Sequence, residues 1–164
     1  MAELTNVHGG NVVLRLRLLR NKWLDVRLGR DDGENWIPFE FSLRVDEELY
    51  EYPPEAGVTF TVHETRELLT HLSSIVAHKL AAKEFETSFE KYEYYNLERN
   101  LGLVLEDALD EGWITIEVWL MIEDVSLGQY SGYDKGFRFV VSVDALAKFT
   151  QGLEEQLQAI IGSD

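Results

Sequence analysis

The first half of the chain alternates apolar and polar residues in short runs and then changes to a helical pattern. Leu14, Leu16 and Leu18 alternate with arginines, which is typical of a strand with one buried face. Such runs predict strands near residues 11–19, 22–29, 36–46 and 57–62. An apolar stripe at helical spacing predicts a helix near 64–80; its members are Leu68, Leu69, Leu72, Ile75, Val76 and Leu80.

The second half repeats this order of patterns. Alternating runs predict strands near residues 85–95, 98–106, 112–123 and 136–142. A second helical stripe predicts a helix near 143–161, with Leu146, Phe149, Leu153, Leu157, Ile160 and Ile161 on one face. Ser142 is the expected N-cap of this helix, because its hydroxyl can accept a bond from a free N–H of the first turn. Asp144 then lies at the positive end of the helix dipole.

Two stretches of the chain have closely similar sequences. The segment 36–45 aligns without a gap on 113–122: both begin Trp-Ile, carry Glu at the fifth position and keep an apolar residue at every second place. The similarity extends upstream, where Leu24, Val26 and Leu28 have the spacing of Leu101, Leu103 and Leu105. We therefore predict an internal repeat within one domain, residues 1–164, with halves at about 11–80 and 85–161.

Each predicted half reads β-β-β-β-α, which gives an α+β fold of antiparallel sheet packed with two helices. Links between the strands are too short for parallel crossovers. The short link at Arg20-Asn21 predicts a hairpin between 11–19 and 22–29. Residues 1–10 read as a loose start and 46–57 as an acidic loop. The pattern leaves open whether the strands form one sheet or two.

Composition restricts the possible partners. The net charge is −15, from 30 acidic and 15 basic residues, which argues against binding to nucleic acid or to an anionic membrane. It favours a basic partner. The chain has no cysteine, so disulfides and thiolate metal sites are excluded. The first residues have neither a basic region nor an apolar core of a signal peptide, so we expect a cytoplasmic protein.

The sequence contains no motif that indicates a particular reaction or a bound cofactor. His71 and His78 are spaced too widely for a helical zinc pair. The acids around 106–112 lack the residue order of a calcium loop. Nucleophile and phosphate-loop signatures are absent, and the carboxylates fall in loops or at polar strand positions. We therefore expect no metal, no cofactor and no catalysis.

The mismatches between the two similar stretches point to a surface. On the strand near 112–123, one face carries the apolar residues and the other carries Trp119 and Met121, where the first copy has Ser42 and Arg44. Coverage by a neighbouring strand or helix would explain an apolar Trp119. The alternative is an exposed anchor for a protein partner, since Trp and Tyr dominate interface hot spots.

Other residues extend this candidate surface. Tyr130, Tyr133 and Asp134 follow in the next loop. Acidic clusters would steer a basic partner towards it; their members in this interpretation are Glu47, Glu48, Glu51, Asp107, Asp110 and Glu111.

The strand-to-helix junctions resemble those of a known family. Residues 60–68 read Phe-Thr-Val-His-Glu-Thr-Arg-Glu-Leu, and residues 137–144 read Phe-Arg-Phe-Val-Val-Ser-Val-Asp. These junction sequences, in this order of strands and helices, resemble those of the small immunity proteins paired with bacterial wall-associated polymorphic toxins. The resemblance implies a non-catalytic inhibitor that binds and blocks a cognate toxin domain, which is often basic.

Three alternatives remain open at this point. A small-ligand or carbohydrate-binding module could use Trp113 and Trp119 as stacking surfaces. An enzyme could place a pair of carboxylates in a cleft between the halves. A homodimer could form through the apolar outer face of the strand that carries Trp119.

Overall fold

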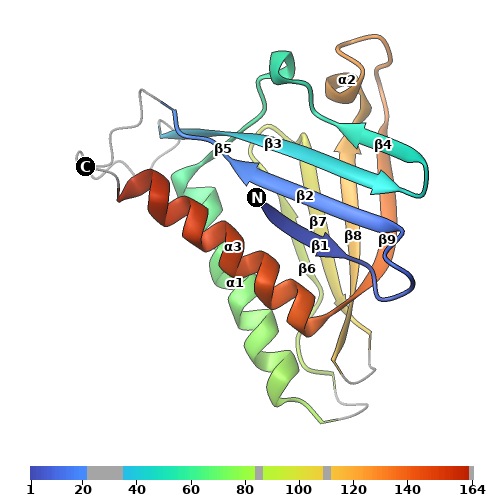
Figure 1. Cartoon of the computed structure of the whole chain (residues 1–164), viewed down its shortest axis with the longest axis vertical. Coiled ribbons are helices and arrows are strands. Elements are labelled where there is room, and N and C mark those ends of the chain that lie inside the picture. The colour runs from blue at the N-terminus through green and yellow to red at the C-terminus, as the bar shows by residue number, and fades with distance from the viewer. Residues whose placement is uncertain (22–34, 84–86, 109–111, 163–164) are drawn as a thin grey trace.

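The computed structural model describes residues 1–21, 35–83, 87–108 and 112–162. Two antiparallel sheets cross each other, and two long helices lie together on one side of the crossing (Figure 1). The predicted α+β class is confirmed, and the strands form two sheets. Within the described residues, no helix is long and apolar enough to cross a membrane.

The first sheet has the order β1-β2-β3-β4, with β5 also paired to β3. Its strands are β1 (Ala2–Thr5), β2 (Val12–Leu18), β3 (Trp36–Val45), β4 (Glu48–Glu51) and β5 (Thr59–Thr61). The end of β3 pairs with β4 and its start pairs with β5, so these two short strands follow one another along one edge of β3. The one-turn helix η2 (Pro54–Ala56) lies between them in the chain.

The second sheet is a four-stranded meander in the order β6-β7-β8-β9. Its strands are β6 (Tyr92–Tyr95), β7 (Leu101–Asp107), β8 (Trp113–Met121) and β9 (Asp134–Ser142). Among the described residues, each of these strands pairs only with its neighbours in the chain, so the short connections noted in the sequence suffice to build the sheet.

Three α-helices complete the fold: α1 (Val62–Ala81), α2 (Ile122–Val125) and α3 (Val143–Ile161). Thr61 and Glu64 form a capping box at the start of α1, and Ser142 caps α3 by accepting the N–H of Ala145 at 3.1 Å. The predicted long helices and the Ser142 cap are therefore confirmed. The short helix α2 was not predicted; it follows β8 directly.

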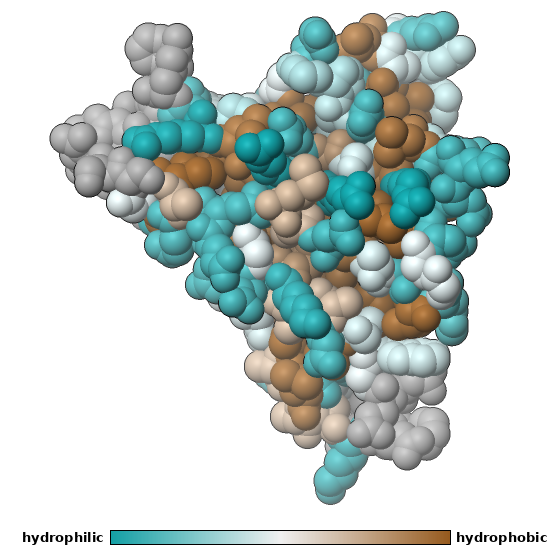
Figure 2. All heavy atoms as spheres, viewed as in Figure 1, coloured by the Kyte–Doolittle hydropathy of each residue, from teal (hydrophilic) through white to brown (hydrophobic). Residues whose placement is uncertain are grey.

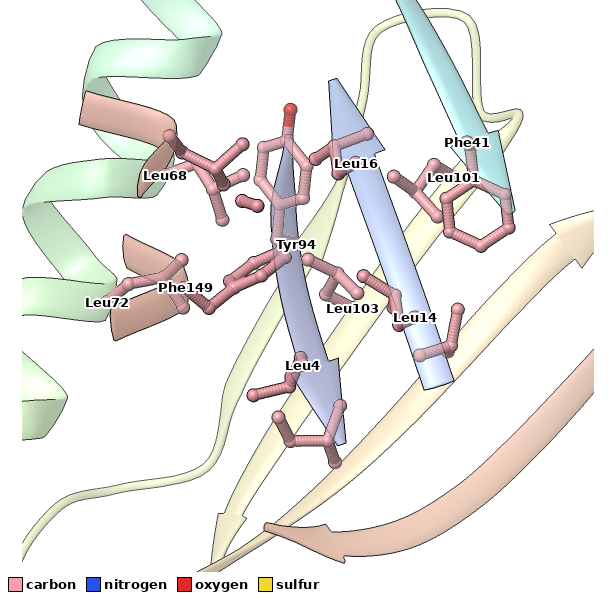
Figure 3. Close-up of a cluster of buried hydrophobic side chains, with 14 of the residues drawn as sticks. Leu4, Leu14, Leu16, Phe41, Leu68, Leu72, Tyr94, Leu101, Leu103 and Phe149 are labelled. Atoms are coloured by element: carbon pink, nitrogen blue, oxygen red, sulfur yellow. The ribbon is translucent and has the colours of Figure 1, made fainter. Parts of the chain in front are cut away.

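The core lies between the two sheets and under the two long helices. Figure 3 shows the ring of Tyr94 from β6 among apolar side chains contributed by α1, α3 and both sheets; those labelled are Leu4, Leu14, Leu16, Phe41, Leu68, Leu72, Leu101, Leu103 and Phe149. Alternation places one face of every central strand here, as in Ile37 and Leu43 of β3 or Ile114 and Val118 of β8, each 0% exposed.

Two buried tyrosines differ in their hydrogen bonding. The hydroxyl of Tyr52, which follows β4, donates to the carbonyl of Asn100 and accepts the N–H of Met121 at 3.3 Å, so it ties the first sheet to the second. The hydroxyl of Tyr94 has no hydrogen-bond partner among the described residues. Burial raises the pKa of both phenols, so both stay protonated.

Strand pairing corrects part of the sequence interpretation. Residues 2–5, expected as a loose start, form β1, and residues 48–51 of the expected acidic loop form β4. In the described residues, β1 and β3 pair with β2 on its two edges. The segment 22–29, the predicted hairpin partner of 11–19, lies outside the described residues. Periodicity identifies a strand but does not determine its neighbours.

Candidate partner-binding surface

The predicted anchors come together at one end of the second sheet. Trp119 and Met121 end β8, the loop after α2 carries Tyr130 and Tyr133, and Asp134 begins β9. This end lies at the top of Figure 1, beside the turn between β6 and β7. The structure thus brings together five residues that sequence reasoning selected from one strand and the loop that follows it.

Trp119 is neither fully covered nor fully exposed. Its ring lies over Gly136 of β9: a Cβ atom added at Gly136 would be 2.8 Å from the indole. The indole Nε1 donates to Glu117 at 3.3 Å. The residue is half-buried, so the neighbouring strand covers Trp119 only in part.

Glycines on the neighbouring strands create the room for this ring. Register places Tyr95, Gly102, Trp119 and Gly136 in one row across the four strands. The ring of Tyr95 lies over Gly102 as the ring of Trp119 lies over Gly136, because neither glycine has a side chain to obstruct it. In this row, the outer face of the second sheet is therefore covered by two aromatic rings.

The loop that carries the two tyrosines is held by its own hydrogen bonds. The hydroxyl of Ser126 accepts the N–H of Tyr130 at 2.9 Å, and the N–H of Gly128 donates to the carbonyl of Glu123 at 2.8 Å. Leu127 has a φ of 51°, in the left-handed region that favours glycine. The loop thereby presents Tyr130 and Tyr133 to solvent with 54% and 56% exposure.

Exposed apolar side chains are concentrated at this end. Within the described residues, nine large hydrophobic side chains are exposed, and five lie in the β6–β7 turn region or the loop after α2; these are Tyr95, Leu97, Leu127, Tyr130 and Tyr133. We call these five together with Trp119 the aromatic end surface. Figure 2 shows the face seen in Figure 1, where hydrophilic and hydrophobic residues are interspersed over the first sheet. Sequence reasoning missed Tyr95 and Leu97, which only the register and the turn bring to the surface.

Carboxylates border the aromatic end surface. Asp134 lies at its β9 side, and Glu98, Glu123 and Asp124 lie between the turn and the loop. Burial raises the pKa of Asp124, a hydrogen bond with Asn100 lowers it, and the nearby charges of Glu123 and Glu98 raise it. These acids are close enough to affect one another, so the local potential is negative.

The acids of the β3–β4 turn lie beside β9. Glu48 accepts from the hydroxyl of Tyr50 and lies 3.8 Å from the ammonium of Lys135. The ring of Tyr50 packs on Phe137 with centroids 4.8 Å apart. Glu47 and Glu51 are exposed next to Glu48. Of the predicted acids of this segment, Glu48 therefore lies beside the strand that Asp134 begins.

Asp107 does not belong to this surface. Its carboxylate bonds Lys79 of α1 at 2.5 Å and accepts the N–H and hydroxyl of Ser88 at 2.6 Å each, and its side chain is 4% exposed. The expectation of an exposed, steering carboxylate is corrected here: a buried charge needs a partner, and Lys79 provides it. The other two predicted acids of this group, Asp110 and Glu111, lie outside the described residues.

The described residues hold no group of three or more His, Asp or Glu side chains that could bind a metal. Glu40 and Glu51 border an open pocket of about 310 Å³ on the first sheet together with Arg15. Glu40 faces Arg17 at 3.4 Å with its side chain 46% exposed, so it has a solvated environment. Acid–base catalysis by two carboxylates instead requires one of them to be buried against apolar walls.

The two tryptophans of β8 are poorly arranged for a single small ligand. Trp113 is 37% exposed and meets His8 edge-on, with ring centroids 5.6 Å apart. At strand spacing it lies about 20 Å from Trp119 along the same face. The two rings therefore do not line one sugar-sized site.

Comparison with known proteins identifies the family. The model of the immunity protein WapI-like family matches residues 4–160. The chain belongs to this family. The resemblance drawn from the strand-to-helix junctions is thereby confirmed.

Solved structures match this chain at low identity and with TM-scores below 0.5. The plant transcriptional regulator PBF-2 superposes with a TM-score of 0.47 at 8% identity, covering 99% of this chain and 84% of that one. WHY3 from Arabidopsis thaliana gives a TM-score of 0.45 at 10% identity, covering 97% and 88% of the two chains. WHY1 from the same plant gives 0.38 at 9% identity, covering 99% and 92%. No curated protein matches the sequence.

Proposed function

We propose that this member of the WapI-like immunity family neutralises a toxin by binding it and blocking its active domain, without catalysing a reaction. The observation that carries the proposal is the aromatic end surface with its border of carboxylates. Exposed tyrosines on a loop fixed by hydrogen bonds lose little conformational entropy on binding, which is what an interface anchor requires. We place the activity in the cytoplasm of the cell that makes the toxin.

The charge of the chain supports a basic partner. A net charge of −15 attracts a basic domain over distance and can raise its association rate by about 10–10³-fold at low salt. This steering term weakens as salt screens the charges. The apolar contacts of Tyr130 and Tyr133 are expected to persist at high salt and to determine the dissociation rate.

The test is co-expression with the product of the neighbouring open reading frame. We expect that product to stop growth when expressed alone, to be tolerated with the immunity protein, and to co-purify with it. The control is a Tyr130→Ala/Tyr133→Ala variant of equal stability, which should lose both rescue and co-purification. A neighbouring product that is harmless, or is toxic but never rescued, would contradict the proposal.

A further inference from the structure

Strand β9 is an edge strand of the second sheet with an open side. It is nine residues long and pairs only with β8 in the described part of the chain. On its other side a single backbone bond is made, from the N–H of Val7 to the carbonyl of Val140 at 2.9 Å. In Figure 1, β9 is the last strand of the second sheet, on the side away from α1.

The Val140 bond shows which residues face the open side. In an antiparallel strand, the N–H and the C=O of one residue both point to the same edge, and those of the next residue both point to the other edge. The backbone groups of Asp134, Gly136 and Arg138 therefore point the same way as those of Val140, away from β8. None of these three makes a backbone bond to another described residue at that edge. Such an edge is a template for strand addition.

The surroundings of this edge favour a basic segment. The two cations of β9 are already engaged: Lys135 by Glu48 and Tyr50, and Arg138 by Glu106 at 2.7 Å and Glu117 at 3.2 Å. The side chains of Asp134 and Glu47 are exposed to solvent. An approaching strand therefore meets negative charge at the end of β9 where Asp134 lies.

Trp119 gives the added strand a side-chain contact. Its ring extends across Gly136 towards the open edge, because Gly136 has no side chain to block it. A residue placed opposite Gly136 on a new strand would lie beside the indole face, where an arginine or lysine gains a cation–π contact of about 0.5–2 kcal/mol.

We infer that the toxin binds partly by adding an extended, basic segment of its own to β9, as a fifth strand of the second sheet. The main-chain groups of Asp134, Gly136 and Arg138 hold the segment, and Trp119 contacts the side chain opposite Gly136. This inference rests on the proposed function and specifies how the toxin is held.

Amide hydrogen exchange, with the purified neighbouring-frame domain as the probe, tests the inference. The N–H groups of Gly136 and Arg138 should exchange rapidly in the free protein and be protected in the complex by at least about tenfold, as for amides that gain a ladder bond. The N–H groups of Phe137 and Phe139 already bond to β8 and are the internal control. A complex in which Gly136 and Arg138 gain no protection overturns strand addition and leaves the proposed function standing.

Two substitutions at Asp134 separate the contribution of its backbone N–H to binding from that of its carboxylate. Asp134→Pro removes an edge N–H, whereas Asp134→Ala removes the carboxylate and keeps the N–H. With stability matched by urea unfolding, we expect Asp134→Pro to bind at least about tenfold more weakly than Asp134→Ala, the size of effect that one lost hydrogen bond of about 1.4 kcal/mol produces. Equal affinities of the two variants would contradict the inference.

Sedimentation of the free protein tests whether a second copy of the chain occupies the β9 edge instead of the toxin. A monomer with exposed Gly136 and Arg138 amides supports an edge kept for the toxin. Concentration-dependent protection of these amides without any toxin would assign the edge to a second copy of the chain and overturn the inference. Absence of any binding by the wild-type protein would instead reject the proposed function itself.

Discussion

Equivalent rows of the two sheets carry opposite chemistry on their outer faces. In the first sheet the row reads Glu3, Arg15, Ser42 and Glu51, and in the second it reads Tyr95, Gly102, Trp119 and Gly136. Ser42 and Trp119 are the positions that the sequence alignment pairs. A small residue beside long charged ones gives a solvated face, and a large ring beside glycines gives an aromatic one.

The comparison shows that a substitution in one strand needs matching changes in its neighbours. Trp119 fits because Gly136 has no side chain, while Ser42 lies between Arg15 and Glu51 at the border of the open pocket on the first sheet. The inner faces of β3 and β8 stayed apolar in both sheets. The outer faces of the two sheets can therefore differ in chemistry without loss of the core.

The largest expected effect is on stability, and it distinguishes a buried ion pair of the second sheet from an exposed ion pair of the first. Asp107→Ala leaves the ammonium of Lys79 buried without its carboxylate, so we expect the free energy of unfolding to fall by about 3–5 kcal/mol. Glu3→Ala breaks an exposed pair with Arg15 and should cost less than about 1 kcal/mol. Urea unfolding measures both. Similar losses in the two variants would show that Asp107 is not a structural anchor.

The next effect concerns binding by the two outer faces. Tyr130→Ala/Tyr133→Ala should weaken toxin binding by about 2–4 kcal/mol, because both side chains are exposed anchors. Arg44→Ala, on the outer face of the first sheet, is the control and should leave affinity unchanged. Isothermal titration calorimetry measures the affinities. A larger loss for Arg44→Ala would move the interface to the first sheet.

A third test concerns the packing of ring on glycine. Gly136→Ala places a methyl group against the Trp119 ring and should cost about 1–3 kcal/mol of stability. In a Trp119→Ser background, which reproduces the residue of the first sheet, the same change should cost little. Thermal and urea unfolding of the four proteins gives the coupling. Additive effects would mean that the ring does not depend on the glycine.

The smallest effect compares the two buried tyrosines. Tyr52→Phe removes the bridge between the sheets, while the Met121 N–H keeps its bond to the Asn100 carbonyl at 3.3 Å, so we expect a cost of about 0.5–1.5 kcal/mol. Tyr94→Phe removes a hydroxyl that has no hydrogen-bond partner in the described structure, so stability should be unchanged or rise by up to about 1 kcal/mol. Equal losses in urea unfolding would indicate that the Tyr94 hydroxyl is bonded in solution.

Much of the fold followed from periodicity alone. The stripes of α1 and α3, the alternation of β3 and β8 and the Ser142 cap were all predicted, because each depends on neighbours within one element. The candidate surface was predicted in part, because Tyr130, Tyr133 and Asp134 follow shortly after the strand in which Trp119 stands where the first copy has Ser42. Tyr95 and Leu97 were missed because only strand register brings them to the same end, and Asp107 was misassigned because its partner lies on α1.

The sequence by itself determined the inner faces, the helices and the acidity of this protein, since burial and charge follow from residue type and spacing. Tertiary structure decided that there are two sheets, that β1 pairs with β2, and that glycines lie on both sides of Trp119. Those features depend on contacts between residues far apart in the chain, which no local pattern records. The same long-range pairing left the edge of β9 open at the place where the aromatic side chains gather.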